Sequence, residues 1–331
     1  MSVSAAHRDR PPAGRSASTG AAPADRLRIA VIVPTYRRPQ ELKRCLEALA
    51  SQLRRPDQLI VVTRQGDEAT QLVLQHADPD GSWLTVAKVQ AGGVVAALNA
   101  GLAMVHADVV AFTDDDAAPR RDWLLQIGAR FTLDARVGAV GGRDWVHHHG
   151  RLVDGAQRVV GRLTWYGRCI GHHHLGVGPP REVDALKGVN MSFRARALEG
   201  VSFDTRLRGS GAQVWNELGV SLAVKRCGWR LVYDPQISVD HYPAARHDED
   251  QRDRFCYEAV QNAAFNETLL LSEHFGRWRR LVYIIWAFGI GHRAAPGLLQ
   301  WLRLQFMEPR TATARLRATW TARVQALRAV R

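Results

Sequence analysis

The chain has 331 residues, of which 46% are hydrophobic and 23% are charged, which is enough for one large core or two smaller ones. This composition excludes a disordered polymer, and its 28 glycines and 14 prolines show no collagen-like period. The four cysteines lie far apart without a C-x-x-C pair, which argues against a zinc ribbon or a disulfide-stapled miniprotein. We therefore expect reduced thiols in a cytoplasmic protein.

The net charge of +13 is concentrated near one end of the chain. From Gly276 onward there are eleven arginines and one acidic residue, Glu308, a net charge of +10. Such a basic tail indicates contact with an anionic surface, either lipid headgroups or nucleic acid.

Along the chain, residues 1–25 are rich in Ala, Pro, Ser and Arg and predict a disordered leader. An apolar strand is expected at 28–33, followed by a helix that Pro39 opens. Further strands are expected at 59–62, 84–89 and 109–112, with amphipathic helices between them. Such alternation predicts a parallel sheet covered on both faces, and hence a nucleotide-binding α/β half over residues 26–125.

The carboxyl ends of parallel strands meet at one edge of a sheet, where ligands bind. Three aspartates, 114–116, directly follow the strand predicted at 109–112. Adjacent carboxylates repel one another unless a cation compensates, and hard oxygen ligands suit Mg²⁺ or Mn²⁺. The alternative is a solvated acidic turn, which the preceding buried strand makes less favourable.

Several segments, in the correct order, resemble glycosyltransferase family 2 on a GT-A fold. They are VIVPTYRR at 31–38, NAGL at 99–102, FTDDD at 112–116, GVNMSFR at 188–194, and the stretch from Glu217 to His241. The resemblance covers residues 28–242 and implies an α/β fold with a mostly parallel central sheet. It also implies an acceptor-binding half, which we expect at 126–270. The composition of the tail separately predicts a basic, partly apolar helical extension at 271–331.

The resemblance implies a metal site and a donor site. The D-x-D motif of the family falls on Asp114 and Asp116, and His241 would approach the Mg²⁺ or Mn²⁺ ion from the other side. The alternative for this histidine is a strand-end side chain bonded to backbone. The implied donor-binding residues are Pro34, Thr35, Tyr36, Arg38, Asn99, Asp114 and Asp115.

One departure from the family pattern concerns the nucleobase. Thr63 and Arg64 stand where family members commonly carry an aspartate that helps to hold the base. We expect Asp67 to reach back from the following loop as a donor-binding residue. The identity of the nucleotide is left open.

The resemblance also implies that Glu217 is the catalytic base, with Asn216 replacing the usual first acid of the pair. A carboxylate near its ordinary pKa of about 4.3 would be ionised and able to accept a proton. The alternative is a surface glutamate. Acceptor contacts are expected from Gly188, Asn190, Met191 and Trp215, the last on a loop at 209–215 that could close over substrate.

Two histidine triplets occur at 147–149 and 172–174. Adjacent side chains rarely converge on one ion, so we expect loop histidines near an acceptor groove instead of a zinc site. In the tail, ten apolar residues at 281–290 are flanked by arginines and are too short to span a bilayer. They predict either a segment lying in the interface of an anionic membrane or helices packed on the catalytic domain.

Together these features predict an inverting, metal-dependent transferase. It would move a sugar from a nucleotide-diphosphate donor to a glycan or lipid-linked acceptor, in cell-surface or extracellular polysaccharide synthesis. We expect no nucleic-acid partner, and a cytoplasmic location with peripheral contact to the inner membrane if the tail is interfacial. The alternatives are a degenerate protein that binds nucleotide sugars without turnover, and a polyanion-binding protein that uses its basic tail.

Overall fold

A computed structural model describes residues 26–251 and 254–330. The leader predicted at 1–25 lies outside the described residues. The strands are β1 Ile29–Thr35, β2 Gln58–Arg64, β3 Thr85–Val89, β4 Val109–Phe112, β5 Ala117–Pro119, β6 Val137–His148, β7 Arg151–Leu152, β8 Arg162–Leu163, β9 Cys169–Ile170, β10 Arg181–Glu182, β11 Met191–Arg194 and β12 Arg230–His241. The α-helices are α1 Pro39–Ala50, α2 Glu68–Ala77, α3 Val94–Leu102, α4 Trp123–Leu133, α5 Asn216–Arg226, α6 Tyr257–His274, α7 Arg277–Gly289, α8 Leu298–Met307 and α9 Pro309–Ala329.

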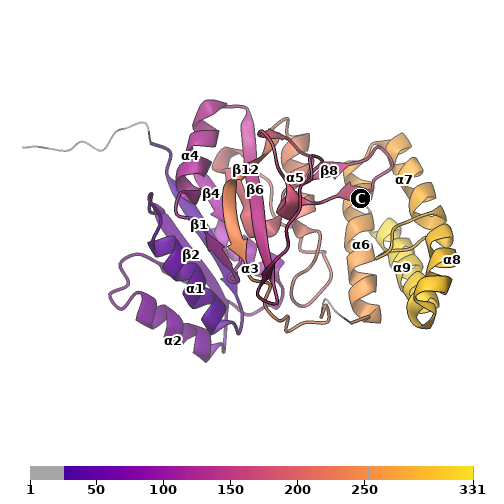
Figure 1. The fold of residues 1–331 in the computed structure, drawn as a ribbon, viewed down its shortest axis with the longest axis horizontal. Helices are drawn as coiled ribbons and strands as arrows, with labels where there is room; N and C mark the ends of the chain where they lie inside the picture. Colours follow the sequence, from indigo (N-terminus) through magenta and orange to yellow (C-terminus); the bar gives the residue numbers. More distant parts are fainter. Residues whose placement is uncertain (1–25, 252–253, 331) are drawn as a thin grey trace, which may run out of the picture.

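A mostly parallel sheet in the order β10-β12-β6-β11-β4-β1-β2-β3 forms the centre of the molecule (Figure 1). β1 pairs in parallel with both β2 and β4, and β6 pairs in parallel with β12. β11 is antiparallel to its two neighbours, β4 and β6, and so joins the two halves. The predicted fold class is confirmed.

The strands β1 and β4 are buried along almost their whole length because helices cover both faces of the sheet there. Val31 and Val33 pack with the buried face of α1, whereas Ile32 packs with α3. α1 begins at Pro39, whose fixed backbone angle suits a first helical position. This arrangement holds the carboxyl ends of β1, β2 and β4 at one edge.

The second half is built on the long strands β6 and β12. β12 continues to His241. Their register shifts between Asp234 and Ser238, and a Cβ at Gly142 would lie 1.7 Å from the Ile237 carbonyl oxygen. Glycine is therefore required at this point of β6, beside the strand that carries His241.

Helices α6 to α9 gather on the side of the sheet away from β2 (Figure 1). α6 contacts α5, and α9 and α7 pack on α6. The buried guanidinium of Arg323 donates hydrogen bonds to the carbonyl oxygens of Ala287, Ala295 and Pro296, which ties α9 to α7 and the following loop. The tail helices therefore pack on the rest of the domain, which was one of the two alternatives predicted for them.

The packing of the tail leaves some apolar side chains exposed. Trp278 and Ile285 of α7 and Phe306 of α8 are exposed to solvent. No helix in the two described ranges has both the length and the hydropathy needed to cross a bilayer. The boundary predicted at residue 270 falls inside α6, and the domain limits stay predictions.

Candidate active site

A cavity of about 770 Å³ lies at the carboxyl ends of β1, β2 and β4. Its opposite wall comes from the start of β11, the first turn of α5 and the end of β12. The cavity brings together the predicted site residues Pro34, Thr35, Tyr36, Arg38, Asp114, Asp115, Asp116, Gly188, Met191, Glu217 and His241.

Asp114, Asp115 and Asp116 follow β4 and form an acidic strand tip. The middle residue, Asp115, turns back toward β1. The Thr35 hydroxyl donates to Asp115 Oδ2 at 2.8 Å, and Arg38 Nη1 donates to Asp115 Oδ1 at 3.0 Å. Burial raises the pKa of Asp115 to about 7, although Arg38 opposes this. Asp115 thus fixes the loop that follows β1, beside the donor residues predicted there.

The outer aspartates, Asp114 and Asp116, form a cluster with His241. One ligand atom from each of the three lies within 4.8 Å of the others, and His241 Nε2 is 3.4 Å from Asp116 Oδ1. Asp116 Oδ1 and both imidazole nitrogens are buried without a hydrogen bond in the described part of the chain. Two carboxylates and an imidazole suit Mg²⁺ or Mn²⁺, so these residues fit a divalent metal.

Burial and charge act against each other in this cluster. Burial alone would raise the pKa of Asp116, but contact with His241 holds it at about 2. Burial alone would lower the pKa of His241, but Asp116 and Asp144 raise it to about 9. The side chains are therefore arranged to stabilise positive charge between them.

Asp144 of β6 supports the cluster from behind. Its side chain is fully buried, and its Oδ2 lies 3.5 Å from His241 Nδ1 and accepts a hydrogen bond from Lys187 Nζ. A carboxylate behind a metal-ligating imidazole fixes the orientation of the ring. Neither Asp144 nor Lys187 was predicted from the sequence, although Lys187 directly precedes the GVN segment and also lines the cavity.

Glu217 projects from the first turn of α5 into the cavity. Burial, and then the charge of Asp114, raise the pKa of Glu217 above its ordinary value. The ordinary pKa that we expected for Glu217 from the sequence was wrong. The replacement of the neighbouring acid by Asn216 could not reveal how deeply the turn is enclosed.

Two of the predicted donor residues do not line the cavity. Asp67 caps α2 by accepting from the Thr70 amide and hydroxyl, and it also accepts from the Arg37 amide at 2.6 Å. The Asn99 amide is bonded on both sides to the backbone of Phe203. At the end of β2 the cavity is lined instead by Thr63 and Arg64.

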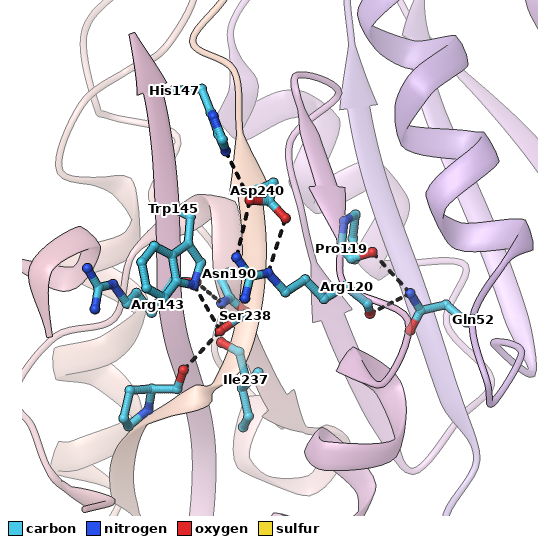
Figure 2. Close-up of polar contacts among 11 residues, drawn as sticks. Gln52, Pro119, Arg120, Arg143, Trp145, His147, Asn190, Ile237, Ser238 and Asp240 are labelled. Atoms are coloured by element: carbon cyan, nitrogen blue, oxygen red, sulfur yellow. Dashed lines mark hydrogen bonds and ion pairs between the residues drawn. The ribbon is translucent and has the colours of Figure 1, made fainter. Parts of the chain in front are cut away.

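Two of the predicted acceptor residues, Asn190 and Trp215, also lie away from the cavity. The Asn190 amide donates to the Ile237 carbonyl at 2.8 Å and accepts from Trp123 Nε1 at 2.9 Å, so it ties β12 to α4. Figure 2 shows Asn190 beside Ile237 and Arg143. Trp215 lines a second cavity, between the domain and the tail helices.

The loop that carries Trp215 is held in place. The Ser210 hydroxyl donates to Glu249, and the Ala212 amide donates to Asp248 at 2.8 Å. The Gly211 carbonyl accepts from the Val94 amide at 2.7 Å, which joins the loop to the start of α3.

The histidine triplets form no metal cluster in the described ranges, where the one such group is Asp114, Asp116 and His241. His147 lies 3.0 Å from Asp240, which also binds Arg120 (Figure 2). His148, at the end of β6, and His174 line the cavity, and their place near an acceptor groove stays a prediction.

Solved structures similar to this chain share its fold. One is a mannosyltransferase, PcManGT, from Pyrobaculum calidifontis in complex with GDP-Man and Mn²⁺, with a TM-score of 0.52 and 18% identity, covering 92% of this chain and 88% of that one. Another is GalNAc-T7 with UDP, GalNAc and Mn²⁺, with a TM-score of 0.62 and 12% identity, covering 84% of this chain and 54% of that one. These likenesses show that the chain has a GT-A fold.

The sequence comparisons identify the family. The model of glycosyltransferase like family 2 matches residues 26–255, and the chain belongs to this family. A glucosyl-dolichyl phosphate glucuronosyltransferase of Haloferax volcanii is 24% identical over 225 residues, which is 65% of this chain and 69% of the relative. The predicted family and the predicted enzyme class are confirmed.

Proposed function

We propose that this glycosyltransferase is inverting and metal-dependent, and that it transfers a sugar from a nucleotide-diphosphate donor to a hydroxyl of a glycan or lipid-linked acceptor. The observation that carries this proposal is the composition of one cavity. It holds a cluster that fits a divalent metal and, on the wall formed by α5, the side chain of Glu217.

The donor diphosphate would lie at the acidic strand tip. Asp114, Asp116 and His241 would hold Mg²⁺ or Mn²⁺, and a bound divalent ion stabilises the negative charge of a leaving diphosphate. Arg38, which lies 3.0 Å from Asp115, and Lys187 also line the cavity and place positive charge in it. The nucleoside would lie beside Pro34, Thr35 and Tyr36.

Glu217 would act as the general base. It accepts the proton of the acceptor hydroxyl while that oxygen bonds to the anomeric carbon and the bond from this carbon to the diphosphate oxygen breaks. Attack from the face opposite the leaving group inverts the configuration of the sugar. The raised pKa of Glu217 brings the base closer to neutral pH, where proton transfer is most efficient.

The test is Glu217→Gln, which keeps the size of the side chain and removes its basicity. We expect unchanged donor binding and a loss of transfer on the order of 100-fold or more. Release of nucleoside diphosphate from a panel of nucleotide sugars, with oligosaccharides and polyprenyl-linked sugars as acceptors, measures transfer. NMR of the product then gives its anomeric configuration.

The matched control is Glu258→Gln, which changes an exposed glutamate in the first turn of α6 that does not line the cavity. Turnover near that of the wild type in Glu217→Gln would remove Glu217 from the role of base. Donor binding without turnover in the wild type, across the whole panel, would favour the degenerate alternative.

We further propose that the outer face of α7 and α8 contacts an anionic membrane, where a lipid-linked acceptor for a cell-surface polysaccharide would be found. Trp278, Ile285 and Phe306 are 82%, 65% and 90% exposed on these helices, and the surrounding tail carries its charge as arginine. Exposed apolar side chains among cations are typical of an interfacial segment.

Co-sedimentation with phosphatidylglycerol vesicles tests this contact. The double change Trp278→Ser and Phe306→Ser should abolish vesicle binding, whereas Leu133→Ser, at an apolar α4 side chain that is 74% exposed, should not. Equal binding by all variants would contradict the contact. A gel shift with nucleic acid that depends on the tail would favour the polyanion-binding alternative instead.

A further inference from the structure

The cavity has two ends, and the proposed function assigns a different part of the donor to each. The anomeric carbon must face Glu217, which lies on the wall formed by α5 and β11. The diphosphate lies between, at the acidic tip after β4. The nucleoside must therefore extend over the ends of β1, β2 and β3, where Tyr36, Thr63 and Arg64 line the cavity.

The guanidinium of Arg64 is held at this end and is not neutralised. It lies 5.2 Å from the centre of the Tyr36 ring, and its Nη1 is 3.3 Å from the position that a Cβ would take at Gly92. No ion pair or hydrogen bond in the described ranges engages the Arg64 side chain. Its planar fork of N–H donors therefore remains available to a ligand.

Thr63 precedes Arg64 in β2, and its side chain is fully buried. Because successive side chains of a strand point to opposite faces, the hydroxyl of Thr63 does not lie beside the guanidinium of Arg64. Arg64 is therefore the residue of this pair that offers hydrogen-bond donors to a ligand.

The carboxylates near this end are already engaged. Asp67 is bonded to the Arg37 amide and to Thr70, and it does not line the cavity. Asp248 accepts from the backbone amides of Ala212 and Asp250. Both carboxylates therefore already accept hydrogen bonds from groups of the protein itself, whereas the side chain of Arg64 has no such partner in the described ranges.

We infer that the donor nucleobase is one that presents two neighbouring hydrogen-bond acceptors to the fork of Arg64. Guanine does so with N7 and O6, and cytosine does so with N3 and O2. Uracil and thymine place an N–H between their two carbonyl groups, and adenine places an amino group beside each accessible ring nitrogen. A bidentate arginine contact therefore selects guanine or cytosine against the other three bases.

The experiment measures the dissociation constants of GDP, CDP, UDP, ADP and dTDP by calorimetry on the full chain with Mn²⁺. We expect GDP or CDP to bind about 10-fold or more tightly than the other three, the discrimination typical of one bidentate pair. The tighter of the two identifies the base. Arg64→Met, which keeps an apolar stem, should remove this preference, and Arg64→Lys should not restore it, because lysine lacks the fork.

Arg37→Met is the matched control, because Arg37 contacts the same Tyr36 ring at 5.1 Å and carries the same charge. It should leave the ratio between nucleotides unchanged even if every nucleotide binds more weakly. Tightest binding of UDP, ADP or dTDP, or a preference that survives in Arg64→Met, would overturn the inference and leave the proposed function intact. Failure of all five nucleotides to bind would refute the proposed function and the inference with it.

Discussion

Metal binding should depend steeply on pH, because a proton occupies the site in the absence of metal. Asp116 and Asp144 raise the pKa of His241 to about 9, so its imidazole is protonated at neutral pH. A metal needs a neutral imidazole and must displace this proton. At pH 7, about two pH units below the pKa, this displacement costs about 2.7 kcal/mol, or about 100-fold in affinity.

The direction in which metal affinity changes with pH follows from the raised pKa of His241. Affinity for Mn²⁺ should rise about tenfold for each pH unit up to about 9 and then level off. The raised pKa of Asp114, due to burial and then to Asp116, acts in the same direction at lower pH. Without the shift, an ordinary histidine would be neutral above about pH 6.5, and the affinity would already be level there.

Electron paramagnetic resonance of free Mn²⁺ measures this affinity directly, in titrations from about pH 7 to about pH 9 without nucleotide. The His241→Asn variant provides the control, since its amide carries no proton to displace. We expect a steep rise for the wild type and a nearly flat profile for the variant. A flat profile for the wild type, or the same slope in both proteins, would refute the reasoning.

Two further substitutions separate positioning from structural roles. Asp144→Asn, measured at about pH 9 where the imidazole proton competes little with the metal, should weaken Mn²⁺ binding about 10-fold or more, because His241 loses the carboxylate behind it. Asp240→Asn should not, and equal losses would contradict the assignment. Asn190→Ala leaves the buried N–H of Trp123 unpaired and should lower the free energy of unfolding in urea by about 1–3 kcal/mol with the acceptor KM unchanged. A changed KM with unchanged stability would instead restore the predicted acceptor role.

The metal cluster could be predicted from the sequence because its parts follow simple rules. An apolar strand that ends in three aspartates places carboxylates at the ligand edge of a parallel sheet. His241 ends β12, a strand parallel to β6, so the same rule brings it near that edge. The structure places Asp114, Asp116 and His241 within reach of one ion.

The directions of individual side chains could not be predicted in this way. Asn99 and Asn190 occupy the positions given by the family motifs, yet both amides bond to neighbouring structure. Asp67 is engaged locally by Thr70, because a helix N-terminus offers backbone donors to an aspartate at its cap. Which of two possible partners a polar side chain takes depends on contacts between distant segments, and spacing in the sequence does not contain these.

In the tail, too, the sequence does not predict the surroundings of individual side chains. Its composition predicts apolar packing and basic exposure, but composition does not tell which side chains are buried. Arg323 is buried among carbonyl oxygens, although its residue type alone would place it in solvent. The position of α9 against α6 decides this burial.

The most direct test of the central claim is the binding of inorganic pyrophosphate, because it requires the metal site but no nucleobase and no acceptor. Its dissociation constant is measured with Mn²⁺ and with EDTA, for the wild type, for Asp116→Asn and for the Asp240→Asn control. We predict that Mn²⁺ strengthens binding about 10-fold or more in the wild type and the control, and has no effect in Asp116→Asn. Equal binding with Mn²⁺ and EDTA in the wild type, or a full Mn²⁺ effect in Asp116→Asn, would contradict a cation held by Asp114, Asp116 and His241.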